Sequence, residues 1–152
     1  MQKKGRILRE YQLLYITKGK GTFASDGTPE RNIGKGNLIV LFPGQWHTYS
    51  PDVQTGWNEY YIGFEGSFID QFVRNGFLSK EDQVLDIGLN EELVTLFSQA
   101  LNVAETDKSA SQQYLSGILL HIIGMIFSIS KNKEFEKDNV AEKMEQAKIN
   151  NE

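Results

Sequence analysis

One apolar segment, followed by a turn and a histidine, constrains the fold of this chain more than any other feature. The segment runs Asn37-Leu38-Ile39-Val40-Leu41-Phe42, and Pro43-Gly44 and then His47 follow it. A short apolar run bounded by turn residues is typical of a buried β-strand. Pro and Gly in succession end such a strand, because proline lacks the N–H that the ladder needs and glycine accepts the backbone angles of a tight turn. The segment therefore predicts a buried strand over 37–42.

Further strand-like stretches fill the rest of the first half of this 152-residue chain. Residues 11–17 are rich in aromatic and β-branched side chains, and Gly19-Lys20-Gly21 after them predicts a hairpin turn. Asp26-Gly27-Thr28-Pro29 and Ile33-Gly34-Lys35-Gly36 predict two more turns. Strands at this short and regular spacing are typical of a barrel or a sandwich rather than of a parallel sheet crossed by helices.

The second half has the longer spacing of apolar residues that is typical of helices. Ser67-Phe68-Ile69-Asp70 has the form of a capping box, which predicts a short helix to about residue 75. Asn90 predicts the start of a second helix, and Ser109 with Gln112 predicts the cap of a third over about 110–129. We interpret the charged segment 131–138 as a linker and residues 140–150 as the start of another helix that the chain does not complete.

The composition excludes some classes of function. Twenty acidic and 16 basic residues give a net charge of -4, which opposes direct DNA binding because a DNA-binding face must be basic. The absence of cysteine leaves neither a disulfide framework nor a thiolate metal site, as is common in the cytoplasm. With only His47 and His121, one subunit cannot build a three-histidine site, so we expect no metal and no other cofactor. The longest apolar stretch, 118–129, is too short and too interrupted to span a bilayer, so we expect no membrane partner.

Aromatic and polar side chains that share strand faces predict a ligand pocket. Tyr49 lies two residues after His47, and Trp57, Glu59 and Tyr61 alternate in the same way, so each set shares one face of a strand. A flat ring beside hydrogen-bonding groups suits a sugar, because the ring covers the sugar's C–H face while polar groups bind its hydroxyls. The alternatives are ordinary core positions for the aromatic residues, and a structural histidine that donates to a backbone carbonyl.

Three segments together resemble the effector-binding, cupin-like domain of AraC-type bacterial transcription regulators. They are the glycine-rich stretch 18–23, the strand and Pro-Gly-x-x-His turn over 36–47, and the strand over 57–66. The resemblance covers about residues 6–129. It implies a mainly β fold with C-terminal α structure, in which a cupin-like double-stranded β-helix (jelly-roll) barrel precedes two to three helices. It also implies three parts: a barrel over 1–66, a helical part of the same domain over 67–130, and over 131–152 a linker with the start of a missing helix-turn-helix DNA-binding domain.

The resemblance implies a sensor of a small-molecule effector, which we expect to be a sugar, and no enzymatic activity. Tyr49, Glu59 and Tyr61 fall where AraC-type sugar sensors place pocket residues, although Glu59 and Tyr61 differ in type from the family's histidine and tryptophan. The identity of the sugar therefore does not transfer. An N-terminal arm can fold over the pocket in this family, so two arginines before the first strand are further candidates. The expected ligand-binding set is Arg6, Arg9, His47, Tyr49, Trp57, Glu59 and Tyr61.

Related sensors dimerise through the last helix, and here apolar residues cover more than one face of the helix over about 110–130. We therefore expect a homodimer, with DNA contacted only through the missing C-terminal domain. The alternative is a core helix held between the barrel and the preceding helix. The expected dimerisation residues are Tyr114, Gly117, Ile118, His121, Gly124 and Met125.

Two other functions stay open at this point. A metal-free cupin isomerase or epimerase would use His47 as the base and Tyr49 or Tyr61 as the acid. A plain carbohydrate-binding module would bind the sugar with no regulatory output.

Overall fold

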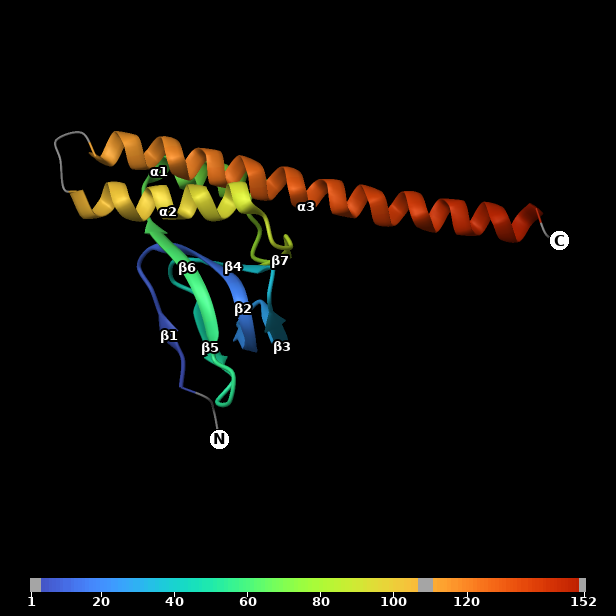
Figure 1. Cartoon of the computed structure of the whole chain (residues 1–152), viewed down its shortest axis with the longest axis horizontal. Coiled ribbons are helices and arrows are strands. Elements are labelled where there is room, and N and C mark those ends of the chain that lie inside the picture. The colour runs from blue at the N-terminus through green and yellow to red at the C-terminus, as the bar shows by residue number, and fades with distance from the viewer. Residues whose placement is uncertain (1–3, 107–110, 151–152) are drawn as a thin grey trace.

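The computed structural model describes residues 4–106 and 111–150, which form two stacked sheets with a helical layer on one outer face (Figure 1). The strands are β1 (Arg6–Ile7), β2 (Tyr11–Ser25), β3 (Thr28–Gly34), β4 (Asn37–Leu41), β5 (Trp46–Pro51), β6 (Trp57–Phe64) and β7 (Val84–Asp86). The helices are α1 (Ser67–Arg74), α2 (Glu91–Thr106) and α3 (Ser111–Asn150). The predicted mainly β fold with C-terminal helices is confirmed, and all the strand pairs are antiparallel.

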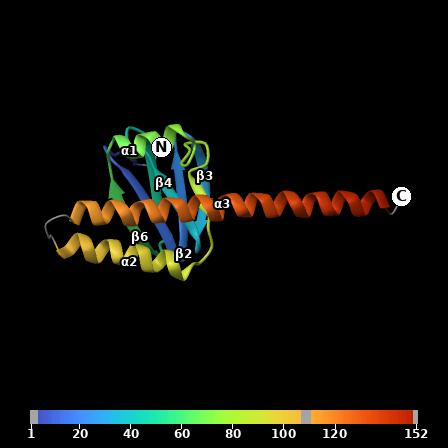
Figure 2. The same cartoon turned by 90° about the horizontal axis from the view of Figure 1, so that it is seen from above.

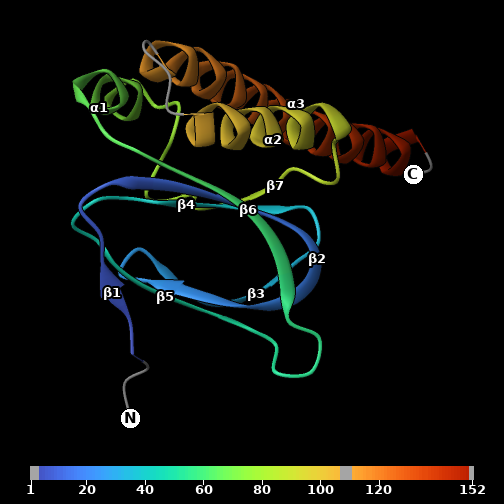
Figure 3. The ribbon, with the colours of Figure 1, turned by 60° about the vertical axis from the view of Figure 1, so that its left-hand side comes forward.

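The long strand β2 joins the two sheets, as Figure 3 shows edge-on. Its first part pairs with β4 and β6, and its last part pairs with β3 and β5. The strand bends at Gly19-Lys20-Gly21, where Gly19 has φ 86°. A Cβ at Gly19 would collide with the Gly56 carbonyl oxygen, and a Cβ at Gly21 would lie 2.7 Å from the ring of Trp57. The hairpin predicted here is therefore wrong, because these glycines bend one continuous strand beneath a closely packed loop.

Alternate residues of β2 serve two separate cores. Leu14 and Ile16 point between the sheets, into an inner core that also holds Phe23, Ile33, Ile39, Leu41 and Val84. Leu13 and Tyr15 point toward the helices, into an outer core that also holds Leu38, Val40, Phe97, Ile122 and Ile126. The predicted buried strand over 37–42 is confirmed as β4, whose alternate residues divide between the same two cores.

Three short strands were missed by the sequence analysis. β1 includes Arg6, which was placed before the first strand, and β3 overlaps both predicted turns at its ends. β7 pairs with β4 after α1 has interrupted the strand-rich part. The division expected at residue 66 therefore leaves one strand of the sheet outside the predicted barrel. β7 has only three residues, which is too short for a recognisable alternation of apolar and polar side chains.

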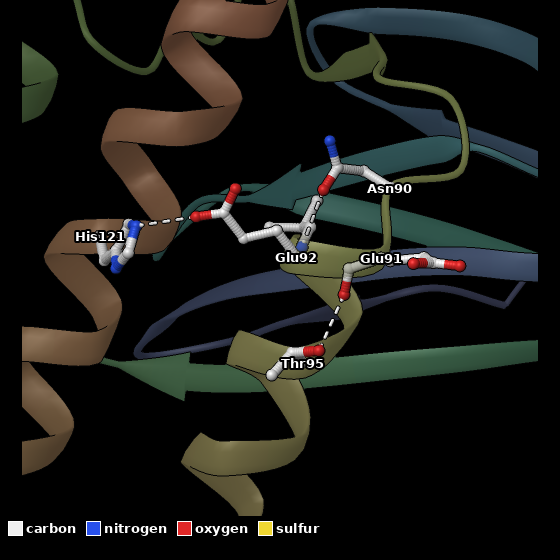
Figure 4. Close-up of polar contacts among 6 residues, drawn as sticks. Asn90, Glu91, Glu92, Thr95 and His121 are labelled. Carbon is white, nitrogen blue, oxygen red and sulfur yellow. Dashed lines mark hydrogen bonds and ion pairs between the residues drawn. The ribbon is translucent and has the colours of Figure 1, made fainter.

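The helix starts agree with the sequence in one case and not in another. Asn90 caps α2, since its Oδ1 accepts the Leu93 N–H at 3.0 Å (Figure 4). Ser67 does not cap α1; Gly66 takes the cap position without a side-chain bond. Tyr15 ties the segment before α2 to the sheet, because its hydroxyl accepts the Asn90 N–H at 3.0 Å and donates to the Gly88 carbonyl at 2.7 Å. The cap predicted at Ser109 lies outside the described residues.

Helix α3 is far longer than the sequence indicated, and it projects well beyond the sheets (Figure 2). It runs through residues 131–138, so the segment that we interpreted as a linker is helical. That segment contains strong helix formers and neither glycine nor proline, and Lys131 lies 3.4 Å from Glu134 one turn away. By length and composition alone, α3 holds one stretch apolar enough to cross a membrane. That evidence is weak, because several of its isoleucines are buried against the rest of this fold.

Substitution of Gly19 tests the bend in β2. Gly19→Ala forces a side chain into the backbone of Gly56, so we expect a clear loss of unfolding free energy in denaturant titration. Gly44→Ala is the matched control, because Gly44 also has positive φ (76°) but nothing lies within 4 Å of its Cβ position. The control should lose only the roughly 1–2 kcal/mol that an L residue spends in the left-handed region. Equal losses in the two variants would contradict a steric requirement at the bend.

Candidate ligand-binding site

In the part of the chain that the structure describes, the strands β1 and β6 are two of the four edge strands of the sheets, and β3 and β7 are the others. Among the described residues β1 pairs with β5 alone, and β6 pairs with β2 alone, so each keeps one unpaired edge. Side chains of β1, β5 and β6 that face the inner core can therefore reach both the interior and the solvent. Most of the residues expected to bind ligand lie on these three strands.

His47 is the buried polar centre of this region, with only 1% of its surface exposed. It lies on β5 opposite Ser25 of β2 and opposite Arg6 of β1, so the three side chains share one face. Neither ring nitrogen makes a hydrogen bond of normal geometry, which for a buried polar group costs about 1–3 kcal/mol. The structural alternative, a hydrogen bond to a backbone carbonyl, is represented only by a contact with the Gln45 backbone that falls outside this geometry. A group left without a partner at such a cost is a candidate for ligand contact.

Burial lowers the pKa of His47, because an imidazolium is disfavoured away from water. The backbone of Gln45 partly opposes this effect, and the positive charge of Arg6 reinforces it. The ring is therefore held neutral at neutral pH, with one nitrogen as a donor and the other as an acceptor.

Tyr49 connects His47 to the two edge strands. Its ring stacks on His47 with centroids 6.2 Å apart and on Trp57 of β6 with centroids 5.6 Å apart. Arg6 of β1 donates from Nη2 to the Tyr49 hydroxyl at 2.9 Å, and its guanidinium carbon lies 5.7 Å from the ring centroid. Residues from three strands thus form one stack of aromatic rings with a cation at its edge.

A cavity of about 280 Å³ opens beside this stack. Its charged side chains are Lys4 and Arg6, and no carboxylate lines it. Thr48 lines it too, and donates from Oγ1 to the Lys4 carbonyl at 2.8 Å, which holds the N-terminal segment against β5. We name this cavity the arginine pocket; its lining is Lys4, Gly5, Arg6, His47, Thr48 and Tyr49.

The predicted residues of β6 share a face but not a common environment. Trp57, Glu59 and Tyr61 alternate along β6, and Trp57 packs against the inner core. Glu59 is exposed, so its carboxylate is not enclosed between the sheets. Tyr61 is 56% exposed. The physical reason is that β6 is an edge strand, whose inner face is covered only where Tyr49 reaches it.

The two candidate arginines, Arg6 and Arg9, lie in different places relative to the arginine pocket. Arg6 faces His47 across the β1–β5 pair and contacts Tyr49. Arg9 is exposed and does not line the arginine pocket. The structure therefore brings together Arg6, His47, Tyr49 and Trp57, while Arg9, Glu59 and Tyr61 lie outside this group.

Sequence reasoning missed several polar residues around the site. Lys4 and Thr48 complete the arginine pocket, and the alternation of Lys4 with Arg6 was the only signal that could have indicated the first. Deeper in the fold, Gln83 receives a bond from Ser25 Oγ at 2.6 Å and donates from Nε2 to Gln45 Oε1 at 2.8 Å and to the Val40 carbonyl at 2.9 Å. The side chains of this buried network form hydrogen bonds with one another and with the backbone, unlike the ring of His47. We therefore interpret the network as a structural part of the fold.

A larger cavity of about 530 Å³ lies outside the sheets, between β6 and the helices. Tyr61 borders it, together with residues of all three helices such as Phe68, Leu101 and Leu115. Among the described residues, no buried polar group without a partner faces this cavity, since His47 alone fits that description. The arginine pocket is therefore the better candidate for a specific site.

The predicted dimerisation residues of α3 differ in exposure. Tyr114, Gly117, His121 and Gly124 are exposed and recur at intervals of three and four residues, which places them on one face. Ile118 is only 6% exposed and belongs to the outer core, and Met125 packs against the same core. His121 Nε2 lies 3.5 Å from Glu92 Oε1 of α2 (Figure 4). Ile118 is thus a core residue and is not available to a partner chain.

Metal ligands do not gather anywhere in the part of the chain that the structure describes. No group of three or more His, Asp or Glu side chains there could hold an ion. The chemistry of the arginine pocket is accordingly that of hydrogen bonds, ring stacking and positive charge.

The neutral state of His47 leads to a pH dependence of stability. Its folded-state pKa is lowered, so below the ordinary value near 6.5 the unfolded chain takes up a proton that the folded chain does not. The contribution of neutral His47 to the free energy of unfolding is therefore fully present above about pH 6.5. It falls by at most about 1.4 kcal/mol per pH unit as the pH drops toward the folded-state pKa. His47→Phe, which keeps a flat ring beside Tyr49, should remove this part of the acid destabilisation. Urea titrations from about pH 8 to 5 measure it, and parallel curves over the acid range would contradict it.

Comparisons with known proteins agree with this architecture. Residues 5–123 match the family model of the AraC-like ligand binding domain. The raffinose operon transcriptional regulatory protein RafR of Pediococcus pentosaceus is 27% identical over 119 residues, which cover 78% of this chain. The matched part spans 43% of that relative's length. Because the family model covers most of the chain, and the open cupin-like sheets with C-terminal helices fit it, this chain belongs to the AraC-like ligand binding domain family.

Proposed function

We propose that this chain is the sensor part of a transcription regulator and that it binds a sugar against the Tyr49–Trp57 stack. The observation that carries the proposal is His47, a buried imidazole without a hydrogen-bond partner that lies beside stacked rings and borders an open pocket. A sugar hydroxyl can supply the missing bond, and the face of its ring can cover Tyr49 or Trp57. The ligand-binding family and the regulator-type relative support the same function.

The proposed class of effector is carbohydrate. The relative's name refers to a raffinose operon, so raffinose and its component sugars are the first compounds to test. Arg6, His47, Tyr49 and Trp57 are the proposed contacts. Glu59 and Tyr61, exposed further along β6, can reach only a ligand that extends out of the pocket.

The regulatory output is proposed to come from α3. Its exposed face carries two glycines, Gly117 and Gly124, with open space above them. Small residues on an exposed helix face allow close approach of a second helix, so we propose that two chains pair through this face. The matched part of the chain spans 43% of its regulator relative, so we place DNA binding in a further domain and the whole regulator in the cytoplasm.

An isomerase or epimerase is less well supported. A general base needs a neighbouring group that orients it, and His47 has no carboxylate or other bonded partner among the described residues. Tyr49 stacks parallel to His47, and its hydroxyl accepts a bond from Arg6. We therefore propose binding without chemical conversion.

Sugar binding can be tested by thermal shift and calorimetry with raffinose, melibiose, galactose and sucrose. A sugar at about 100 times its dissociation constant should add roughly 2.7 kcal/mol of stability, seen as several degrees in the melting temperature. Trp57→Leu should weaken binding about ten-fold, because it removes the stacking surface, whereas Trp57→Phe should retain most of the affinity. A panel of neutral and acidic sugars that leaves the melting temperature of the wild type unchanged would contradict the proposal.

The proposed helix pairing predicts a concentration-dependent dimer. Gly124→Glu places a charged side chain on the exposed face of α3 and should shift the chain to monomer in sedimentation equilibrium. The substitution improves helix propensity, so loss of folding is not expected. Asn102→Glu is the control, since it adds the same charge at an exposed position of α2. A wild-type chain that stays monomeric at high concentration, or a Gly124→Glu variant that still dimerises, would refute pairing through this face.

A further inference from the structure

The charges of the arginine pocket oppose those of the chain as a whole. The protein carries a net charge of -4, yet the charged side chains that line this pocket are the cations Lys4 and Arg6. A concave site lined by one sign of charge concentrates ligands of the opposite sign. This local excess of positive charge is the first indication of what the pocket selects.

Two side chains that carry hydrogen-bond donors are neighbours at the arginine pocket. Arg6 and His47 are direct partners across the β1–β5 pair, so their side chains stand next to each other on one face. The guanidinium has five N–H donors, and the contact with the Tyr49 hydroxyl uses one of its nitrogens. The Tyr49 hydroxyl accepts that bond and keeps its own proton to donate. The neutral ring of His47 has one N–H, which makes no hydrogen bond of normal geometry with the described protein groups.

A carboxylate or a phosphate is bound by groups of this kind: a positively charged guanidinium with its fork of N–H donors, a phenol hydroxyl and an imidazole N–H. We infer that the effector carries an oxyanion, which binds in the arginine pocket between Arg6 and His47 while the rest of the sugar covers Tyr49 and Trp57. The inference rests on the proposed function and narrows it from sugars in general to acidic sugars, either uronic acids or sugar phosphates. The volume of about 280 Å³ suits the charged end of such a ligand rather than a whole oligosaccharide.

The other acceptor in the pocket fits the same ligand. When one nitrogen of His47 donates to the oxyanion, the second nitrogen remains an acceptor for an adjacent sugar hydroxyl. An acidic sugar supplies both groups on one molecule, and a neutral sugar supplies only the hydroxyl. Binding of a neutral sugar would leave the Arg6 and Lys4 charges without an anion in a partly covered site.

Calorimetry with D-galacturonate and D-galactose tests the inference, because the two differ only in a carboxylate at C6. D-galactose 6-phosphate and inorganic phosphate complete the set and distinguish a sugar acid from a sugar phosphate and from a free anion. At low ionic strength an acidic sugar should bind about ten-fold or more tightly than galactose, the gain expected of one charge-assisted hydrogen-bonded pair. Its affinity should fall as salt is added, because the charges are partly exposed.

Two arginine variants make the test specific. Arg6→Gln should weaken binding of the acidic sugar far more than binding of galactose, and so remove most of the preference. Arg9→Gln removes the same charge from an exposed position outside the pocket, so the preference should survive. Arg6→Lys keeps the charge without the fork and should fall between the two. Arg6 is exposed, and the melting temperature of each variant checks that it folds.

The outcomes separate this inference from the proposed function. Equal affinities for galactose and both acidic sugars, or a preference that Arg6→Gln leaves intact, would overturn the oxyanion site while sugar sensing stands. Inorganic phosphate that binds as tightly as the sugar phosphate would support the oxyanion site but remove the support for a sugar. No heat of binding with any of the four probes would overturn the oxyanion site.

Discussion

Both sheets depend on one bent strand, because β3, β4, β5 and β6 all hydrogen-bond to β2. The bend requires glycine at positions 19 and 21, where the loop before β6 and the ring of Trp57 approach the backbone too closely for any side chain. The same close approach brings Trp57 against Tyr49. The constraint that folds β2 between two sheets is thus also the one that assembles the aromatic part of the proposed ligand site.

The site lies beside the edge strands β1 and β6. β1 and β6 have no further strand to pair with among the described residues, so their inner faces remain open to solvent. An edge strand can carry Arg6 on the same face as a fully buried His47, because its long side chain reaches from the exposed edge over the rings. In the centre of either sheet a guanidinium would need a buried partner, and the inner core there is apolar.

Local patterns predicted the features that local interactions determine. The apolar run before Pro43 became β4, and Asn90 became the cap of α2, since each depends on neighbours within a few residues. The Gly-x-Gly stretch was misread because the same residues serve a hairpin and a bend, and the choice depends on Trp57 far along the chain. The contact between Arg6 and His47 follows from the β1–β5 register, which no local pattern contains. The exposure of Glu59 could not be predicted because alternation gives the face of a strand but not whether that face is covered.

β6 is the physical connection between the site and the helices. Its inner face holds Trp57 against Tyr49, and its outer face holds Tyr60 against Phe97 of α2, with ring centroids 6.2 Å apart. Phe97 in turn belongs to the outer core on which α3 packs. A ligand can bias the helices along this route only if it binds one position of β6 better than another, since equal affinity shifts no equilibrium. A ligand that stacks against Trp57 has such a difference in affinity between positions of β6, because the Trp57 ring also packs into the bend of β2. A movement of β6 at the site would therefore require the outer core to repack.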